Sequence, residues 1–158
     1  MKQVIYTGNF ANEKKYVANG FTCISIALKP SRFFVSRNFM PELAPTYDML
    51  SISDEAYVPK YAEILKKINP EEILNKISIL SKGKPAVLMC FEKEGDFCHR
   101  RLVAEWLQNL YKIEVKELGR MEQVKNPKKA DATQGSYESF HYDFEITKER
   151  NIIKVTSN

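Results

Sequence analysis

The sequence of 158 residues contains only two histidines and three cysteines. Three cysteines without the spacing of a disulfide framework are typical of a protein in the reducing cytoplasm, so we expect no disulfide. No apolar run approaches the length that spans a bilayer, and the opening MKQVIYTG lacks the hydrophobic segment of a signal peptide. These absences predict a cytoplasmic protein with no membrane partner.

The sequence also lacks a large excess of positive or negative charge. The formal net charge is +4, and no long block carries a single sign. This balance permits an anionic ligand but does not predict nucleic-acid binding, which usually requires a clustered basic face. Hydrophobic residues make up 44% of the chain and charged residues 28%, a composition typical of a globular protein with one buried core.

Several sequence signatures of known chemistry are missing. The chain has no Walker-type loop, no GxGxxG and no Cys-x-x-Cys, so we expect no cofactor. The Cys-x5-Arg loop of phosphatases is also absent, because the sixth residue after Cys90 is Asp96 and the sixth after Cys98 is Ala104.

Strand-like and helix-like segments alternate along the first 120 residues. The β-rich runs predict strands at 3–7, 21–28, 85–91 and 113–118. Apolar spacing and start signals predict helices at 55–68, from Asn69 as N-cap to Gly83, and at 97–111. This alternation predicts an α/β fold with a parallel sheet flanked by helices, and we expect the strand order second-first-third-fourth.

The residue pattern of the chain changes after Met121. We expect an α/β domain at 1–120, a linker at 121–136 and a β-hairpin tail at 137–158. Apolar residues at 140, 142, 144 and 146 alternate with polar ones, and 152–156 could return as the second strand. An isolated hairpin is marginal, so we expect this one to pack on the main sheet or on a partner, such as a second copy of the chain.

The motif CFEKEGDFCHRRLVAEWL at 90–107 gathers two cysteines and one histidine near the end of a predicted strand. With Asp96 as N-cap, the helical phase directs His99 inward, places Cys98 and Arg100 on its flanks and turns Arg101 away. A helix N-terminus at the carboxyl end of a parallel sheet favours an anion. We therefore expect a ligand site whose wall includes His99, Arg100, Thr7 and Asn9.

Each of these residues also has a purely structural interpretation. An inward histidine can simply be buried and hydrogen-bonded, and Cys98 can be an inert thiol in the core. Arg101 and Glu105 have the spacing of a surface ion pair. A metal site at Cys90, Cys98 and His99 would need a distant fourth ligand, so we expect none.

The same motif resembles the signature of the domain of unknown function 488 family, in which a strand is followed by a C-x-E…CHR-x-x-V/I-A pattern. The stretches IYTGNF and LAPTYDML agree with this family as well, so the resemblance covers about residues 1–120. It implies a small Rossmann-like α/β fold and implies no established reaction. The residues that match the signature directly are Cys90, Glu92, Cys98, His99 and Arg100.

The resemblance extends less closely to the end of the first strand, at Thr7, Gly8 and Asn9, because many members have His where this chain has Asn9.

The first hypothesis for the function is a protein that binds or processes a small anionic or nucleotide-like ligand. His99 would be the general acid or base, and Glu92 would orient it or act as a second base.

In this hypothesis Cys98 is a candidate catalytic thiol, while Arg100, Cys90 and the first-strand residues bind the ligand.

The second hypothesis is a non-enzymatic module that binds a nucleotide or nucleic acid. Its basis is the basic aromatic stretch 29–39, where aromatics could stack on bases while Arg32 meets phosphate. The third hypothesis is a role in partner binding for the C-terminal hairpin.

Overall fold

The structure is a computed structural model that describes residues 3–91, 98–119, 142–147 and 152–157. Its strands are β1 (Ile5–Asn9), β2 (Thr22–Ser25), β3 (Ala86–Cys90), β4 (Val115–Glu117), β5 (Tyr142–Thr147) and β6 (Ile152–Ser157). Its α-helices are α1 (Glu13–Ala18), α2 (Asp54–Lys66), α3 (Pro70–Ser81) and α4 (His99–Tyr111). Three short 3-10 turns complete these elements: η1 (Phe10–Asn12), η2 (Pro41–Leu43) and η3 (Tyr47–Ser51).

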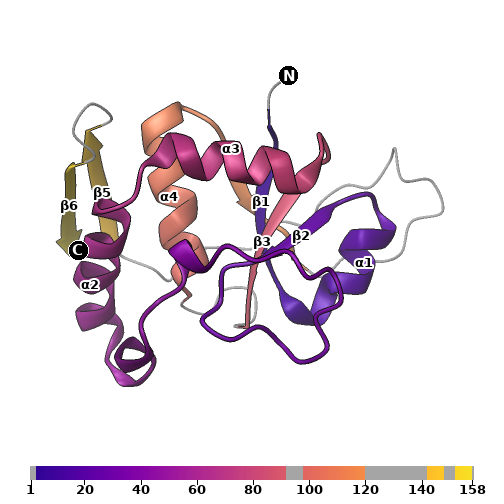
Figure 1. Cartoon of the computed structure of the whole chain (residues 1–158). Helices are drawn as coiled ribbons and strands as arrows, with labels where there is room; N and C mark the ends of the chain where they lie inside the picture. Colours follow the sequence, from indigo (N-terminus) through magenta and orange to yellow (C-terminus); the bar gives the residue numbers. More distant parts are fainter. Residues whose placement is uncertain (1–2, 92–97, 120–141, 148–151, 158) are drawn as a thin grey trace.

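Four parallel strands form the main sheet in the order β2-β3-β1-β4 (Figure 1). The predicted α/β class is therefore confirmed, as is the adjacency of β1 and β3. The predicted strand order is wrong at both edges, because β2 pairs with β3 instead of β1 and β4 pairs with β1 instead of β3. The chain passes from β2 through α2 and α3 back to the neighbouring position, in keeping with the tendency of consecutive strands to lie side by side.

Helix α3 begins as the sequence predicts. The Asn69 side chain accepts a hydrogen bond from the backbone N–H of Glu71, and Pro70 occupies the first helical position. The helix ends at Lys82, whose φ of 52° is left-handed, and Gly83 follows at φ 83°. Two successive left-handed residues stop the helix and turn the chain into β3.

Helix α4 begins later than the sequence predicts. Its N-cap is Cys98, with extended φ and ψ of −154° and 150°, and its first helical residue is His99. The predicted N-cap, Asp96, lies outside the described residues. The start at His99 puts this histidine and the arginine after it into the first helical turn, directly above the carboxyl end of β3.

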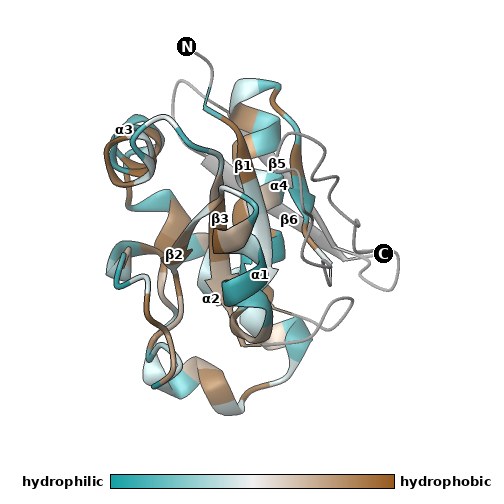
Figure 2. Ribbon diagram, turned by 90° about the vertical axis from the view of Figure 1, so that its right-hand side faces the viewer, coloured by the Kyte–Doolittle hydropathy of each residue, from teal (hydrophilic) through white to brown (hydrophobic). Residues whose placement is uncertain are grey.

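The two faces of the sheet are covered by different elements. One face packs against α2, α3 and α4 in the larger core, which includes Leu88 and Trp106. The other face packs against α1 and part of the segment 29–39, through Tyr16 and Phe34. Figure 2 shows the apolar strands β1 and β3 in the middle of the molecule.

Helix α1 is the element that the sequence pattern did not predict. It packs closely on β1, because a Cβ atom on Gly8 would lie 2.8 Å from the Tyr16 ring and 2.9 Å from Val87 Cγ1. The Tyr16 hydroxyl donates a hydrogen bond to the Leu118 carbonyl at 2.8 Å. The absence of a side chain at Gly8 therefore allows α1 to pack closely on β1.

Strands β5 and β6 form a separate antiparallel pair, with Tyr142 opposite Ser157 and Thr147 opposite Ile152. The linker predicted at 121–136 lies outside the described residues, so the domain boundaries stay predictions. None of the helices in the described ranges is long and apolar enough to cross a membrane.

Candidate functional site

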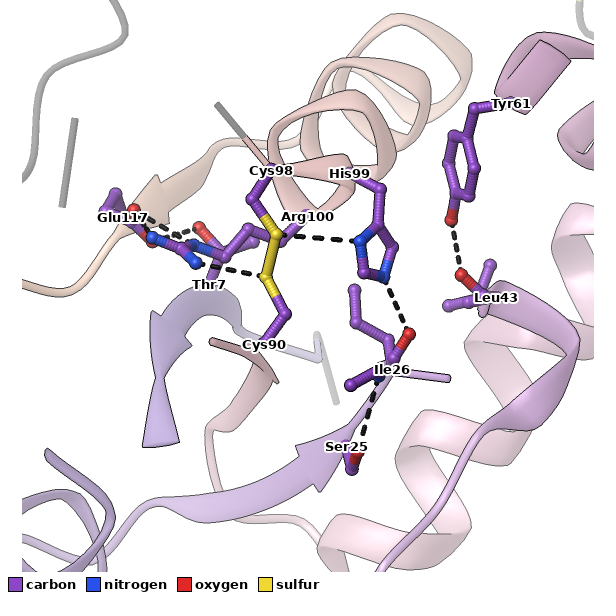
Figure 3. Close-up of a disulfide and its surroundings, with 11 residues drawn as sticks. Thr7, Ser25, Ile26, Leu43, Tyr61, Cys90, Cys98, His99, Arg100 and Glu117 are labelled. Atoms are coloured by element: carbon purple, nitrogen blue, oxygen red, sulfur yellow. Dashed lines mark hydrogen bonds and ion pairs between the residues drawn. A yellow bond between two sulfur atoms is a disulfide. The ribbon is translucent and has the colours of Figure 1, made fainter. Parts of the chain in front are cut away.

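Cys90 and Cys98 form a disulfide between the last residue of β3 and the N-cap of α4 (Figure 3). The expectation of no disulfide is therefore wrong. That expectation rested on spacing along the sequence, whereas the bond depends on how the chain returns in space. The chain leaves β3 at Cys90 and comes back to the same end of the strand eight residues later.

His99 lies beside this disulfide and points into the protein, as its helical phase predicts. It is 5% exposed, and its Nε2 lies 2.6 Å from the Ile26 carbonyl oxygen. A carbonyl oxygen can only accept a hydrogen bond, so Nε2 carries the proton and Nδ1 carries the lone pair. Nδ1 lies 3.5 Å from Cys98 Sγ.

The imidazole of His99 is neutral near physiological pH. Burial lowers the pKa of His99 to about 4; the Ile26 carbonyl opposes this shift and the Arg100 charge adds to it. The edge of the Tyr61 ring contacts the imidazole, with ring centroids 5.4 Å apart. The lone pair on Nδ1 therefore carries no proton at this pH.

Arg100 is buried in an ion pair with Glu117 of β4, and each side chain is 1% exposed. Its Nη2 lies 2.8 Å from Glu117 Oε2, its Nε lies 3.0 Å from Oε1, and its Nη1 lies 3.0 Å from Cys90 Sγ. The Thr7 hydroxyl donates to the same carboxylate at 2.8 Å. Arg100 is therefore a core residue, and Glu117 supplies its buried counter-charge.

Glu117 was not predicted as a site residue, although the residue pattern of β4 indicates that its side chain is buried. Val115 and Glu117 alternate along a short strand, so a residue pattern that buries the first also buries the second. A carboxylate in that position requires a buried partner.

Arg101 is also buried, at 8% exposure, and pairs with Glu105 at 3.1 Å. The predicted ion pair is confirmed, but the prediction that Arg101 faces solvent is wrong. All residues of α4 from His99 to Ala104 are buried, so the first turns of this helix have no solvent-facing side.

A pocket of about 340 Å³ opens beside the disulfide at the carboxyl ends of β2 and β3. Cys90, Cys98 and His99 contribute to its wall. The remaining lining residues follow β2 and β3, belong to the segment that leads into α2 or lie in the first turns of α2: Ala27, Leu28, Lys29, Pro45, Tyr47, Met49, Leu50, Ile52, Asp54, Tyr57 and Phe91. The long segment 29–54 thus supplies a large part of the wall.

Several other candidate residues lie near the cluster or on β1 but do not line this pocket. Of the expected wall, only His99 lines this pocket, and Thr7, Asn9 and Arg100 do not. Asn9 pairs in register with Cys90 and accepts a hydrogen bond from the Asn12 amide at 3.3 Å. Gly8 packs against α1 as described above.

The last two candidates are Arg32 and Glu92. Arg32 is exposed, with its guanidinium carbon 4.8 Å from the centre of the Phe33 ring. Glu92 lies outside the described residues.

Three potential metal ligands meet at the pocket. The Sγ atoms of Cys90 and Cys98 and a ring nitrogen of His99 all lie within 4.8 Å of one another, and all three residues are buried. These residue types bind zinc when the thiols are reduced and ionised.

The fold and the site define a parallel α/β protein with thiol and imidazole groups at the carboxyl end of its sheet. Residues 5–110 match the family DUF488-N3a, described as the active DUF488-N3 subclade. The chain belongs to this family, and the resemblance found in the sequence is confirmed. Searches of curated proteins and of solved structures each found no match.

Replacing Arg100 with alanine should destabilise the fold. Glu117 would keep a buried charge without its ion-pair partner, which typically lowers the free energy of unfolding by about 3–5 kcal/mol. Urea denaturation followed by circular dichroism measures this change. The matched control is Lys76→Ala, which removes the partly exposed pair with Glu42 and should lower stability by about 0–1 kcal/mol. Equal losses in the two variants would contradict a structural role for Arg100.

Thiol labelling should distinguish the three cysteines. Cys23 is buried in the smaller core, and burial raises the pKa of its thiol to about 12. We expect no labelling of the native oxidised chain by iodoacetamide. After mild reduction, we expect labelling of Cys90 and Cys98, which line the pocket. Mass spectrometry counts the adducts, and modification of Cys23 before global unfolding would contradict this assignment.

Proposed function

We propose that the chain binds a small anionic, nucleotide-like ligand in the pocket beside the Cys90–Cys98 disulfide. The observation that carries this proposal is the pocket itself, which combines His99 and the two cysteines with an apolar and aromatic wall. Open α/β sheets bind ligands outside the carboxyl ends of their strands, and this pocket occupies that place.

The wall suits a ligand with an aromatic body. Tyr47 is 75% exposed and Phe91 55% exposed, so both rings have uncovered surface at the pocket. Leu50 is 61% exposed and adds an aliphatic surface. A planar base stacks on such rings with a gain of about 1–3 kcal/mol.

The charged residues of the wall suggest where an anionic group binds. Lys29 and Asp54 both line the pocket, and Lys29 is exposed. Arg100 is paired with Glu117 inside the protein. In this proposal Lys29, instead of Arg100, binds the anionic group of the ligand.

The chemistry-bearing part of the pocket is His99 with Cys98. The fixed tautomer leaves Nδ1 as a base facing the sulfur, 3.5 Å away. After reduction of the disulfide the Cys98 thiol can donate a hydrogen bond to this nitrogen, and the thiol becomes a nucleophile once its proton is lost. Processing of the ligand would therefore require the reduced chain, whereas binding would not.

Thermal unfolding with nucleoside 5′-monophosphates and inorganic phosphate tests the binding. A ligand at 100 times its Kd stabilises the native state by about 2.7 kcal/mol. For a chain of this size that raises the unfolding midpoint by about 5–10 °C. Lys29→Ala should weaken binding of the responding phosphate about tenfold, corresponding to about 1.4 kcal/mol.

The matched control for that experiment is Lys14→Ala. Lys14 is an exposed lysine of α1, which covers the opposite face of the sheet. If no phosphate compound shifts the midpoint, or if Lys14→Ala weakens binding as much as Lys29→Ala, the proposal is wrong.

A second candidate function is single-stranded nucleic-acid binding by the segment 29–39. The observation in its favour is Phe33, which is 73% exposed with the Arg32 guanidinium over its ring. An exposed aromatic next to a cation is the combination that stacks a base and meets a phosphate. Phe34 of the same segment is buried in the smaller core and takes no part.

Fluorescence anisotropy with a labelled single-stranded oligonucleotide tests this candidate. Phe33→Ala should weaken binding by about 1–3 kcal/mol, the contribution of one stacked base. The control Val35→Ala changes a residue of the same segment that is 68% exposed but has no ring. No measurable binding, or equal losses in both variants, would exclude this function.

A further inference from the structure

We propose that reduction of the Cys90–Cys98 disulfide turns this cluster into a zinc site, with both thiolates and His99 Nδ1 as ligands and a fourth position open to the pocket. The inference deepens the proposed function, because the open position would bind the anionic group of the ligand. Sites with three protein ligands and one exchangeable position are typical of catalytic zinc.

The first observation is the convergence of the three ligand atoms. They come from the end of β3 and the start of α4, they lie within 4.8 Å of one another, and their residues are buried. Zinc bonds of about 2.3 Å to sulfur and 2.0–2.1 Å to nitrogen place neighbouring ligand atoms about 3.5–3.8 Å apart. The cluster therefore needs only small side-chain shifts to reach this geometry.

The second observation is the orientation of His99. A metal-binding imidazole usually donates its other ring N–H to a carbonyl or carboxylate, which fixes the tautomer and the ring. Nε2 of His99 already donates to the Ile26 carbonyl at 2.6 Å, and Tyr61 packs against the ring. Nδ1 is left with its lone pair on the side of the sulfurs.

The third observation is the support given to Cys90. Arg100 Nη1 lies 3.0 Å from Cys90 Sγ, and Glu117 holds the guanidinium in place from the other side. A guanidinium donating to sulfur favours the thiolate over the thiol. Figure 3 shows the two sulfurs between Arg100 on one side and His99 on the other.

The backbone spacing of the two cysteines fits the same inference. Their Cα atoms lie 7.4 Å apart, beyond the span of about 4.4–6.8 Å usual for disulfides. Two sulfurs on one zinc ion lie about 3.8 Å apart when each bond is about 2.3 Å. A wider backbone spacing therefore accommodates an ion between the sulfurs without moving β3 or α4.

The conversion balances in two steps. An external dithiol reductant gives two electrons and two protons to the disulfide, which yields two cysteine thiols and the oxidised reductant. Zn²⁺ then replaces the two thiol protons, which pass to solvent. The charges of two thiolates cancel that of the ion, and neutral His99 adds none.

The fourth coordination position of the zinc ion is the reason why the sequence predicted no metal site. A zinc site made only of side chains would need a fourth protein ligand, and the sequence has none near these three residues. In the structure all three residues line a pocket of about 340 Å³. Water or the anionic oxygen of a ligand can complete the coordination from that pocket, so no fourth side chain is required.

Cobalt binding to the full chain tests the inference, with Co²⁺ as a spectroscopic substitute for zinc. The chain reduced by a phosphine without oxygen should bind one Co²⁺, with thiolate-to-metal bands in the near ultraviolet and the intense visible bands of tetrahedral cobalt. Added Zn²⁺ should displace the cobalt and bleach both sets of bands. The oxidised chain should bind none.

Matched variants assign the ligands. Cys90→Ser and His99→Gln should each reduce metal affinity by more than the roughly 10–100-fold lost when a supporting residue is changed. Cys23→Ser is the control, because Cys23 lies in the core on the other face of the sheet. Circular dichroism checks that each variant folds.

A measurement on the unmodified sequence covers the case in which a variant does not fold. Zinc should protect Cys90 and Cys98 of the reduced native chain from alkylation by iodoacetamide. Absence of cobalt bands, binding that Cys23→Ser abolishes, or no protection by zinc would each overturn the inference.

Failure of the zinc site and failure of the proposed function are distinguishable. Phosphate compounds that stabilise the oxidised chain, together with no metal binding by the reduced chain, would remove the zinc site alone. Cobalt binding with no response to any phosphate compound in either redox state would retain the metal site and remove the proposed ligand.

Discussion

The buried ion pair between Arg100 and Glu117 joins three elements at the centre of the fold. Its carboxylate accepts from the guanidinium of α4 and from the Thr7 hydroxyl of β1, and it belongs to β4. Removing two charges from water is unfavourable unless hydrogen bonds satisfy both groups, and here they do. Because α4 must present Arg100 to Glu117, the start of this helix has one position and one rotation relative to the sheet.

That position determines what the start of α4 can do. Residues next to Arg100 in the chain are brought to the end of β3, so Cys98 meets Cys90 and His99 turns toward the Ile26 carbonyl. The cluster is thereby held from two sides, by the guanidinium at Cys90 Sγ and by the carbonyl at Nε2. Groups positioned in this way lose little freedom when they bind a ligand or an ion.

The sequence predicted those features that depend on local periodicity. The inward direction of His99 follows from its phase with the apolar face of α4, and the start of α3 follows from Asn69 and Pro70. The burial of Arg100 was not predictable in the same way, because its partner Glu117 is 17 residues away and meets it only in the folded chain. The disulfide was missed for the same reason, and α1 because its six residues are too few to show a clear period.

The internal pairing of Arg100 also constrains how this site can recognise an anion. Glu117 cancels its charge, and the formal charges of Lys29 and Asp54 in the pocket wall cancel each other. Burial keeps His99 neutral, so it adds no positive charge. In the proposed function an anionic ligand would therefore be attracted by local contacts with Lys29 or by a cation bound at the sulfurs, and the field of the wall as a whole would contribute little. In the proposed zinc site the redox state of Cys90 and Cys98 would decide whether such a cation binds, and in this way it would control the affinity of the pocket for anions.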